Sequence, residues 1–198
     1  MRQRIPLTAI AVVAGLTLLA ACGGSSGSAG PSKPDSTTVA PEVNPAGDIP
    51  DTQVYVPYSP ESGGYTVTVP EGWARTDLPN GAVFTDNFNS VRVEKTAATT
   101  APTTLSVQAD VVPQLRADGA SVISGGTHVV RKAGNALLIT YLQDSTPDPT
   151  TGKKVVLAEK RYAFWKNGTL VTLTLSGAKG ADNVDPWRTV TNSFAWSP

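Results

Sequence analysis

The chain has 198 residues with 16 basic and 16 acidic side chains, a single cysteine, Cys22, and a single histidine, His128. This length suits one folded domain with accessory segments. Nucleic-acid-binding proteins usually gather a basic excess on one face, and the sequence has none, so nucleic acid is excluded as a partner. One histidine and one cysteine likewise exclude a Cys/His zinc site, and we expect no metal and no cofactor.

Residues 1–21 have the pattern of a secretory signal peptide. Arg2 and Arg4 precede an apolar run from Ile5 to Ala20, and small residues end the segment. The run holds about 16 residues, whereas a membrane-spanning helix needs roughly 20. We therefore expect the segment to direct export and to be removed, which leaves 14 basic against 16 acidic side chains.

The four residues Leu19-Ala20-Ala21-Cys22 resemble the lipobox of bacterial lipoproteins. In that motif the cysteine sulfur receives a diacylglyceryl group, and cleavage occurs just before the cysteine. Each buried methylene contributes about 0.8 kcal/mol, so two acyl chains on Cys22 anchor a protein durably. We expect a lipid anchor on the extracytoplasmic face of the cell membrane. The alternative is an ordinary secreted protein whose thiol falls at this position by chance.

Residues 22–51 are predicted to form a disordered tether after the lipidated cysteine. Gly, Ser, Pro, Thr and Ala dominate the segment, and such a composition buries too little apolar surface to fold. A flexible chain of this length reaches roughly 30 Å. The folded domain is expected over residues 52–198, and it must rest on its core because Cys22 has no cysteine to pair with.

The first predicted strand is 65–69, where β-branched and aromatic residues alternate before Pro70 stops the run. Residues 82–85 and 90–95 are the next two strands, and the short polar connection between them predicts a hairpin.

Residues 103–118 are ambiguous, because their apolar residues alternate as in a strand and also share one helical face. Proline is harmful inside a helix but tolerated in its first turn. Pro113 therefore favours a helix over 110–118 with Asp110 as its N-cap, extending back toward Thr104.

The second half of the domain is predicted to be mainly β-strand, over residues 127–132, 136–144, 155–165 and 170–176. A loop at 145–154, with two prolines and a glycine, separates the middle pair. Asn167-Gly168 joins the last pair, and this dipeptide predicts a tight hairpin because both turn positions need positive φ.

The chain ends with a predicted amphipathic helix. Asp185 is its expected cap, Pro186 takes the first helical position, and Trp187, Val190 and Phe194 follow at helical spacing. Strands outnumber helices and do not alternate with them. The predicted fold class is therefore α+β, with a mainly antiparallel sheet flanked by helices.

Candidate catalytic and metal-binding residues are few. His128 falls in mid-strand with no serine motif around it, so we interpret it as a strand-surface residue rather than a catalytic base. The acidic loops Asp144 to Thr151 and Asp182 to Asp185 lack the spacing of a calcium loop, and turns and a helix cap explain them better. The sequence gives no positive sign of a carboxylate pair for glycoside hydrolysis.

The tryptophans are the remaining candidates for ligand contact. Trp73 and Trp187 are expected to pack in the core. Trp165 lies beside the hairpin turn and Trp196 near the chain end, and these two are the weak ligand-binding candidates.

Two segments resemble a known family. The ending 180–188 with Ser193-Phe194-Ala195-Trp196, and the strand 65–73 that closes in Val-Pro-Glu-Gly-Trp, resemble small actinobacterial lipoproteins of the Lpq type and, more broadly, the PsbP-like fold. The resemblance covers about Val54 to Trp196. It implies a central antiparallel sheet flanked by helices and a non-catalytic accessory, assembly or binding role, but it carries over no ligand residue.

These features together indicate a non-enzymatic binding or assembly module of the cell envelope, which engages a protein partner or a small amphipathic ligand. One alternative is a carboxylate-dependent envelope hydrolase, which a deep cleft with clustered acidic residues would favour. The other is a structural cell-wall spacer, which a convex surface would favour.

The lipidation of Cys22 is directly testable. We expect Cys22→Ser to abolish incorporation of radiolabelled fatty acid and to release the protein from membranes, because the sulfur is the acylated atom. Ser25→Ala, three residues further along the tether, is the matched control and should keep both label and membrane association. Continued labelling of Cys22→Ser would contradict the anchor.

Overall fold

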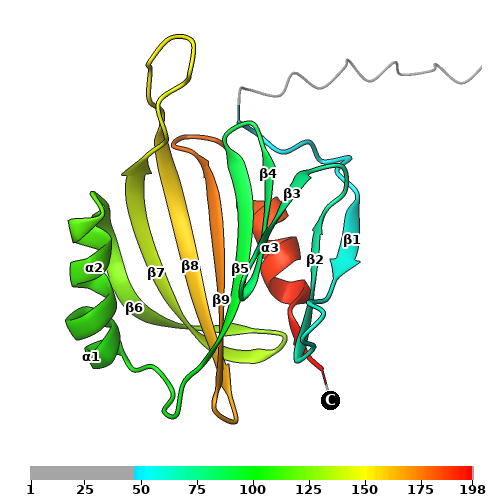
Figure 1. Ribbon diagram of the computed structural model, residues 1–198, viewed down its shortest axis with the longest axis vertical. Coiled ribbons are helices and arrows are strands. Elements are labelled where there is room, and N and C mark those ends of the chain that lie inside the picture. Colours follow the sequence, from blue (N-terminus) through cyan, green and yellow to red (C-terminus); the bar gives the residue numbers. More distant parts are fainter. Residues whose placement is uncertain (1–46, 198) are drawn as a thin grey trace, which may run out of the picture. The chain divides into compact units, whose positions relative to one another are not determined.

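The computed structural model describes residues 47–197, so Cys22, the signal peptide and most of the predicted tether lie outside the described residues. Within the described part, no helix is long and apolar enough to cross a membrane. A seven-stranded sheet forms the body of the domain, and a three-stranded sheet accompanies it (Figure 1).

The elements follow one another along the chain with short connections. The strands are β1 (Tyr55–Tyr58), β2 (Tyr65–Pro70), β3 (Ala74–Leu78), β4 (Gly81–Asp86), β5 (Asn89–Ala97), β6 (Ser121–Arg131), β7 (Gly134–Asp144), β8 (Val156–Lys166), β9 (Thr169–Ala178) and β10 (Ala195–Trp196). The helices are α1 (Thr104–Ser106), α2 (Val112–Ala117) and α3 (Val184–Ser193), with a π-helical turn at Val107–Val111 between the first two.

The large sheet has the strand order β3-β4-β5-β9-β8-β7-β6, and the small sheet has the order β1-β2-β10. Every neighbouring pair in both sheets is antiparallel. Of the connections between strands of the large sheet, only the one from β5 to β6 contains helices. This connection leads from β5 to the far edge of the sheet, so that β9 is the strand that pairs with β5. The predicted α+β class with a mainly antiparallel sheet is therefore confirmed.

The main core lies on one face of the large sheet, under α3 and the small sheet. Side chains alternate between the faces of a strand, and Val171, Leu173 and Leu175 of β9 point to this face with no exposed surface. The Phe194 ring stacks on the Phe164 ring with centroids 4.3 Å apart and on the Tyr65 ring at 5.8 Å. These aromatic contacts join β8, β2 and the residue that ends α3 into one core.

The helical segment begins earlier than Asp110, and the predicted N-cap is wrong. Thr103 is the N-cap: its hydroxyl accepts from the Ser106 backbone, and the Ser106 hydroxyl accepts from the Thr103 backbone. This capping box satisfies two otherwise unpaired N–H groups. Pro113 lies in the first turn of α2, directly after the π-helical turn. Within a continuous α-helix, a proline ring would clash with the carbonyl of the preceding turn.

The strand β6 starts at Ser121, six residues before the predicted start at 127, and two glycines in this part of the strand let the helical segment approach it closely. The Thr104 hydroxyl donates to the Gly126 carbonyl at 2.7 Å, and the Gln108 amide donates to the Gly125 carbonyl at 2.6 Å. The register shifts twice here, as β-bulges do. The helical segment thereby binds carbonyl groups of an edge strand.

The two hairpins predicted from the sequence are present. β4 pairs with β5, and β8 pairs with β9 around Asn167 and Gly168, whose φ values are 48° and 82°. The final helix is present too, but it begins at Val184 with Asn183 as N-cap, so the predicted cap at Asp185 is wrong. Asp185 instead pairs with Arg188 at 2.8 Å within the helix.

Candidate functional site

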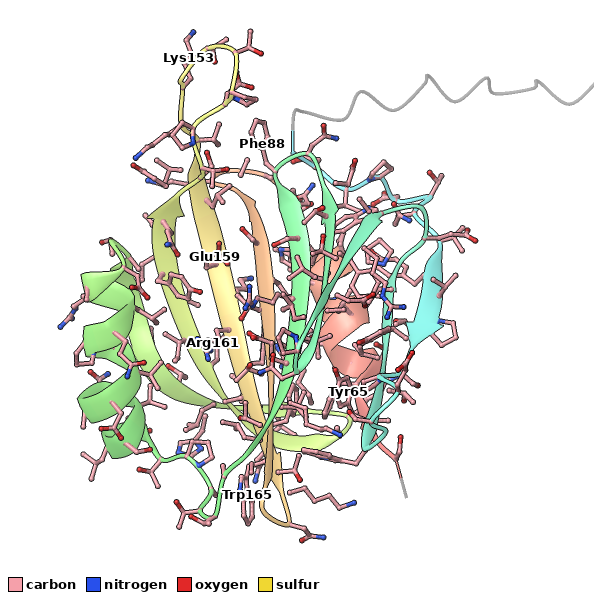
Figure 2. The ribbon with its side chains drawn as sticks, in the orientation of Figure 1. Tyr65, Phe88, Lys153, Glu159, Arg161 and Trp165 are labelled. Carbon is pink, nitrogen blue, oxygen red and sulfur yellow. The ribbon has the colours of Figure 1, made fainter. Side chains whose placement is uncertain are left out.

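The second face of the large sheet is only partly covered. The helical segment packs Val107, Val112 and Leu115 against Leu137 and Ile139 of β7. The neighbouring strands β8, β9, β5 and β4 present mostly hydroxyl and charged side chains on this face, which we call the open face (Figure 2).

The strand register sets the rows of the open face. One row runs from Glu159 across Ser176 and Ser90 to Thr85. The next row runs from Arg161 across Thr174 to Arg92. Residues two apart on a strand share a face, so the two rows are neighbours and present a carboxyl group, two guanidinium groups and several hydroxyls together.

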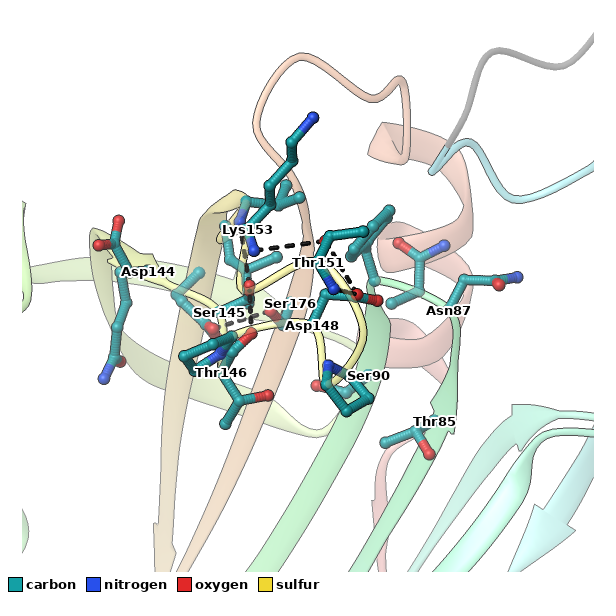
Figure 3. A pocket seen from close by; sticks show the side chains of 18 residues that line it. Thr85, Asn87, Ser90, Asp144, Ser145, Thr146, Asp148, Thr151, Lys153 and Ser176 are labelled. Carbon is teal, nitrogen blue, oxygen red and sulfur yellow. Dashed lines mark hydrogen bonds between the residues drawn. The ribbon is translucent and has the colours of Figure 1, made fainter.

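A pocket of about 610 Å³ lies where the open face meets the β4–β5 turn and the β7–β8 loop (Figure 3). Phe88 of the turn, Val155 of the loop and Leu157 of β8 supply apolar walls. Glu159 and Ser176 bring polar groups to the same pocket. Its lining residues come from three separate parts of the chain, so the sequence alone does not show it.

The β7–β8 loop is ordered by its own hydrogen bonds. The Asp148 Oδ1 atom accepts from the backbone N–H groups of Thr150 and Thr151, at 3.0 and 2.7 Å, and from the Thr151 hydroxyl at 2.9 Å. These bonds hold the pKa of Asp148 below its ordinary value. The Ser145 hydroxyl accepts from the Val155 N–H at 3.0 Å and ties the two ends of the loop together.

The acidic loop from Asp144 to Thr151 is the first of the two that were considered for calcium. Its hydrogen bonds show that it is a structural turn. Asp144 forms an exposed ion pair with Lys154 at 3.8 Å, while Asp148 holds its own loop. Among residues 47–197, no three acidic, histidine or cysteine side chains gather in a way that could hold a metal ion.

A buried amide cluster lies behind the β4–β5 hairpin, on the face of the large sheet that α3 covers. Asn89, which lines the pocket, and Asn183 both donate to the Gly47 carbonyl at 3.0 Å, and Asn183 also donates to the Asn89 Oδ1 atom at 3.0 Å. The Asn183 Oδ1 atom accepts from the Ile49 N–H at 2.8 Å. Residues 47–51, which the sequence assigns to the tether, therefore belong to the folded domain.

Glu159 is the half-buried carboxyl group of the pocket. The Ser176 hydroxyl donates to the Glu159 Oε1 atom at 2.7 Å. Burial raises the pKa of Glu159 above its ordinary value, although the Ser176 hydrogen bond works in the opposite direction. Burial also raises the pKa of the adjacent Tyr141 to about 12, with a further contribution from Glu159. Glu159 thus keeps its proton to a higher pH than an exposed glutamate.

Glu94 on the same face has the opposite environment. The Arg92 Nε and Nη2 atoms donate to the two Glu94 carboxylate oxygens at 2.6 and 2.9 Å. This paired hydrogen bond lowers the pKa of Glu94 despite its partial burial. The row that contains Arg161 lies between the rows of Glu94 and Glu159.

The residues singled out from the sequence lie elsewhere. The Trp165 indole N–H donates to the Ala98 carbonyl at 2.8 Å, and Trp196 lines a separate groove of about 480 Å³ with Lys95 and Lys166. A ligand role for either tryptophan stays a prediction. His128 is an exposed residue of β6, as its position in a predicted strand indicated.

The similarity of this chain to known proteins lies in its three-dimensional structure. No protein-family model matches the chain, and no curated protein matches it. The cyanobacterial PsbP protein (CyanoP) of Synechocystis is similar in structure, with a TM-score of 0.54 and 17% identity over 77% of this chain and 99% of that one. The domain therefore has a PsbP-like fold.

Two further solved structures are more distant. LpqN of Mycobacterium tuberculosis, described as involved in cell envelope biogenesis, has a TM-score of 0.44 and 15% identity over 75% of this chain and 93% of that one. The Ran-binding protein Mog1p of Saccharomyces cerevisiae has a TM-score of 0.48 and 11% identity over 72% of this chain and 95% of that one.

The two shifted carboxyl groups predict opposite pH effects on stability. Folding raises the pKa of Glu159, so the wild-type protein loses stability as the pH rises from the ordinary value of 4.5 through the folded pKa. Glu159→Gln has no carboxyl group to ionise and should not lose stability in this way. The free energy of unfolding of the variant should therefore rise relative to that of the wild type as the pH increases over this window. Urea denaturation at a series of pH values measures the difference.

Glu94→Gln is the matched comparison. Folding lowers the pKa of Glu94, so its contribution is present above 4.5 and disappears as the pH falls through the folded pKa. The variant should be less stable than the wild type at neutral pH and approach it in acid. Parallel pH profiles for both variants would contradict the assigned environments.

Proposed function

We propose that the protein is a non-enzymatic binding module of the cell envelope, anchored to the extracytoplasmic membrane face through acylated Cys22, which holds a small amphipathic ligand in the pocket. The observation that carries this proposal is the pocket itself. Its volume of about 610 Å³ lies in the range of small-molecule sites, which combine apolar walls with a few polar groups.

The length of chain between Cys22 and the domain also favours this function. The described residues begin at Gly47, whose carbonyl accepts from the side chain of Asn89, a residue next to Ser90 of the pocket lining. Residues 23–46 separate Gly47 from Cys22 in the sequence, and a flexible segment of that length reaches roughly 25–30 Å. A lipid anchor on Cys22 would therefore hold the domain within that reach of the membrane surface.

The acidic residues around the pocket favour binding over hydrolysis. Asp148 accepts three hydrogen bonds within its loop, Asp144 faces Lys154, and Glu159 accepts from Ser176. Paired catalytic carboxyl groups flank one bond of a substrate at a defined separation, whereas these three carboxyl groups serve separate structural contacts. The concave pocket also argues against a purely structural spacer.

Site-specific photocrosslinking in intact cells tests the proposed function. Phe88 is 41% exposed at the pocket, and Leu105 is 81% exposed on the helical segment. A benzoylphenylalanine at position 88 should form a small-molecule adduct that mass spectrometry detects on the intact protein. The same group at position 105 is the control and should not form it.

Equal labelling at both positions would contradict a ligand in the pocket. Turnover of an envelope substrate by the purified mature protein, lost in Glu159→Gln, would overturn the non-enzymatic role. The two results are distinguishable because the first concerns adduct position and the second concerns product formation.

A further inference from the structure

We infer that the ligand is an amphipathic anion, whose carboxylate or phosphate group binds the Arg161 guanidinium while its apolar part fills the pocket. This inference rests on the proposed function, because it names the class of molecule that the same pocket takes.

Arg161 is a cation of the open face that forms no ion pair among the described residues, and its charge contributes only through space to the lowered pKa of Glu94. Arg161 is half-buried on β8. Among residues 47–197, the four ion pairs use Arg75, Arg92, Lys154 and Arg188. No carboxylate or carbonyl of the described residues accepts a hydrogen bond from Arg161, so its five N–H donors remain available.

Arg161 lies outside the pocket lining but next to it on the open face. Glu159 precedes it by two residues on the same strand and lines the pocket, and both side chains rise from the open face (Figure 2). Two residues along a strand span roughly 7 Å. A ligand that fills the pocket past Glu159 and Ser176 would therefore bring its end group to Arg161.

The other charges on the open face leave Arg161 as the anchoring point for an anion. Arg92 gives two of its N–H groups to Glu94, so these two charges compensate each other. The Glu159 carboxyl group accepts a hydrogen bond from the Ser176 hydroxyl, and burial raises its pKa. Lys153 adds a further cation at the pocket rim.

The chemistry of a guanidinium group selects the ligand class. A guanidinium binds carboxylate and phosphate through two parallel N–H···O bonds, and such charge-assisted bonds are about twice as strong as neutral ones. The apolar walls formed by Phe88, Val155 and Leu157 exclude a purely hydrophilic anion as the best ligand. An elongated molecule with one anionic end satisfies both parts of the site.

Calorimetric titration of the full mature chain carrying Cys22→Ser tests this inference. The probes are decanoate, decyl phosphate and the uncharged decanoyl-N-methylglucamide, each below its micellar concentration, and inorganic phosphate without an apolar chain. We expect both amphipathic anions to bind more tightly than the uncharged probe, and inorganic phosphate to bind weakly. Decanoate against decyl phosphate distinguishes the two possible anionic groups.

Arg161→Gln isolates the guanidinium. We expect it to weaken binding of the amphipathic anions by about tenfold to a hundredfold, the effect of losing a charge-assisted hydrogen bond, and to leave the uncharged probe unchanged. Arg188→Gln removes the same charge from α3, which covers the other face of the sheet, and should change nothing.

A second variant separates this inference from the proposed function. Leu157→Trp fills the pocket and should abolish binding of every decyl probe, with circular dichroism confirming that the variant folds. Tight binding of the uncharged probe, equal to that of the anions and insensitive to Arg161→Gln, would overturn the anionic ligand but keep the pocket. Binding that survives Leu157→Trp would contradict the pocket itself.

Discussion

The buried hydrogen bond between Asn89 and Asn183 is the contact on which the site end of the domain depends. These two amides tie the β4–β5 hairpin, the start of α3 and the entering chain at Gly47 to one another. A Cβ atom on Gly177 would lie 2.8 Å from the Asn183 amide nitrogen, so only glycine leaves room for the cluster. Each buried polar group of the cluster left unpaired would cost about 1–3 kcal/mol.

The unequal covering of the two sheet faces explains how one set of strands serves both core and site. In β8 and β9, alternate residues such as Phe164 and Leu173 are buried beneath α3 and the small sheet, while the residues between them form the open face. The helical segment covers only the β6 and β7 side, because its own hydrogen bonds fasten it to Gly125 and Gly126. The polar strands beside it stay accessible to a ligand.

The sequence predicts the elements better than their junctions, and the reasons are local. Asn167-Gly168 predicts its hairpin because positive φ is a property of those two residues. Asp185 fails as a cap because Asn183, two residues earlier, is held by Asn89 and Gly47, which lie far away in the sequence. The pocket could not be predicted, since Phe88 of the β4–β5 turn meets Val155 and Glu159 only when β5 and β8 both pair with β9. In β8 the charged residues Glu159, Lys160 and Arg161 are consecutive, so the sequence shows no polar alternation that would mark one strand face as accessible.

The location of a bound ligand is the most direct test of this account. Nuclear Overhauser contacts between ¹³C-labelled decanoate and the protein should connect the alkyl chain to Phe88, Val155 and Leu157. The carboxylate end should perturb the Arg161 guanidinium resonances. Contacts to Trp196 and the groove beside Lys166, or no contacts at all, would contradict the claim that the pocket and the open face form one binding site.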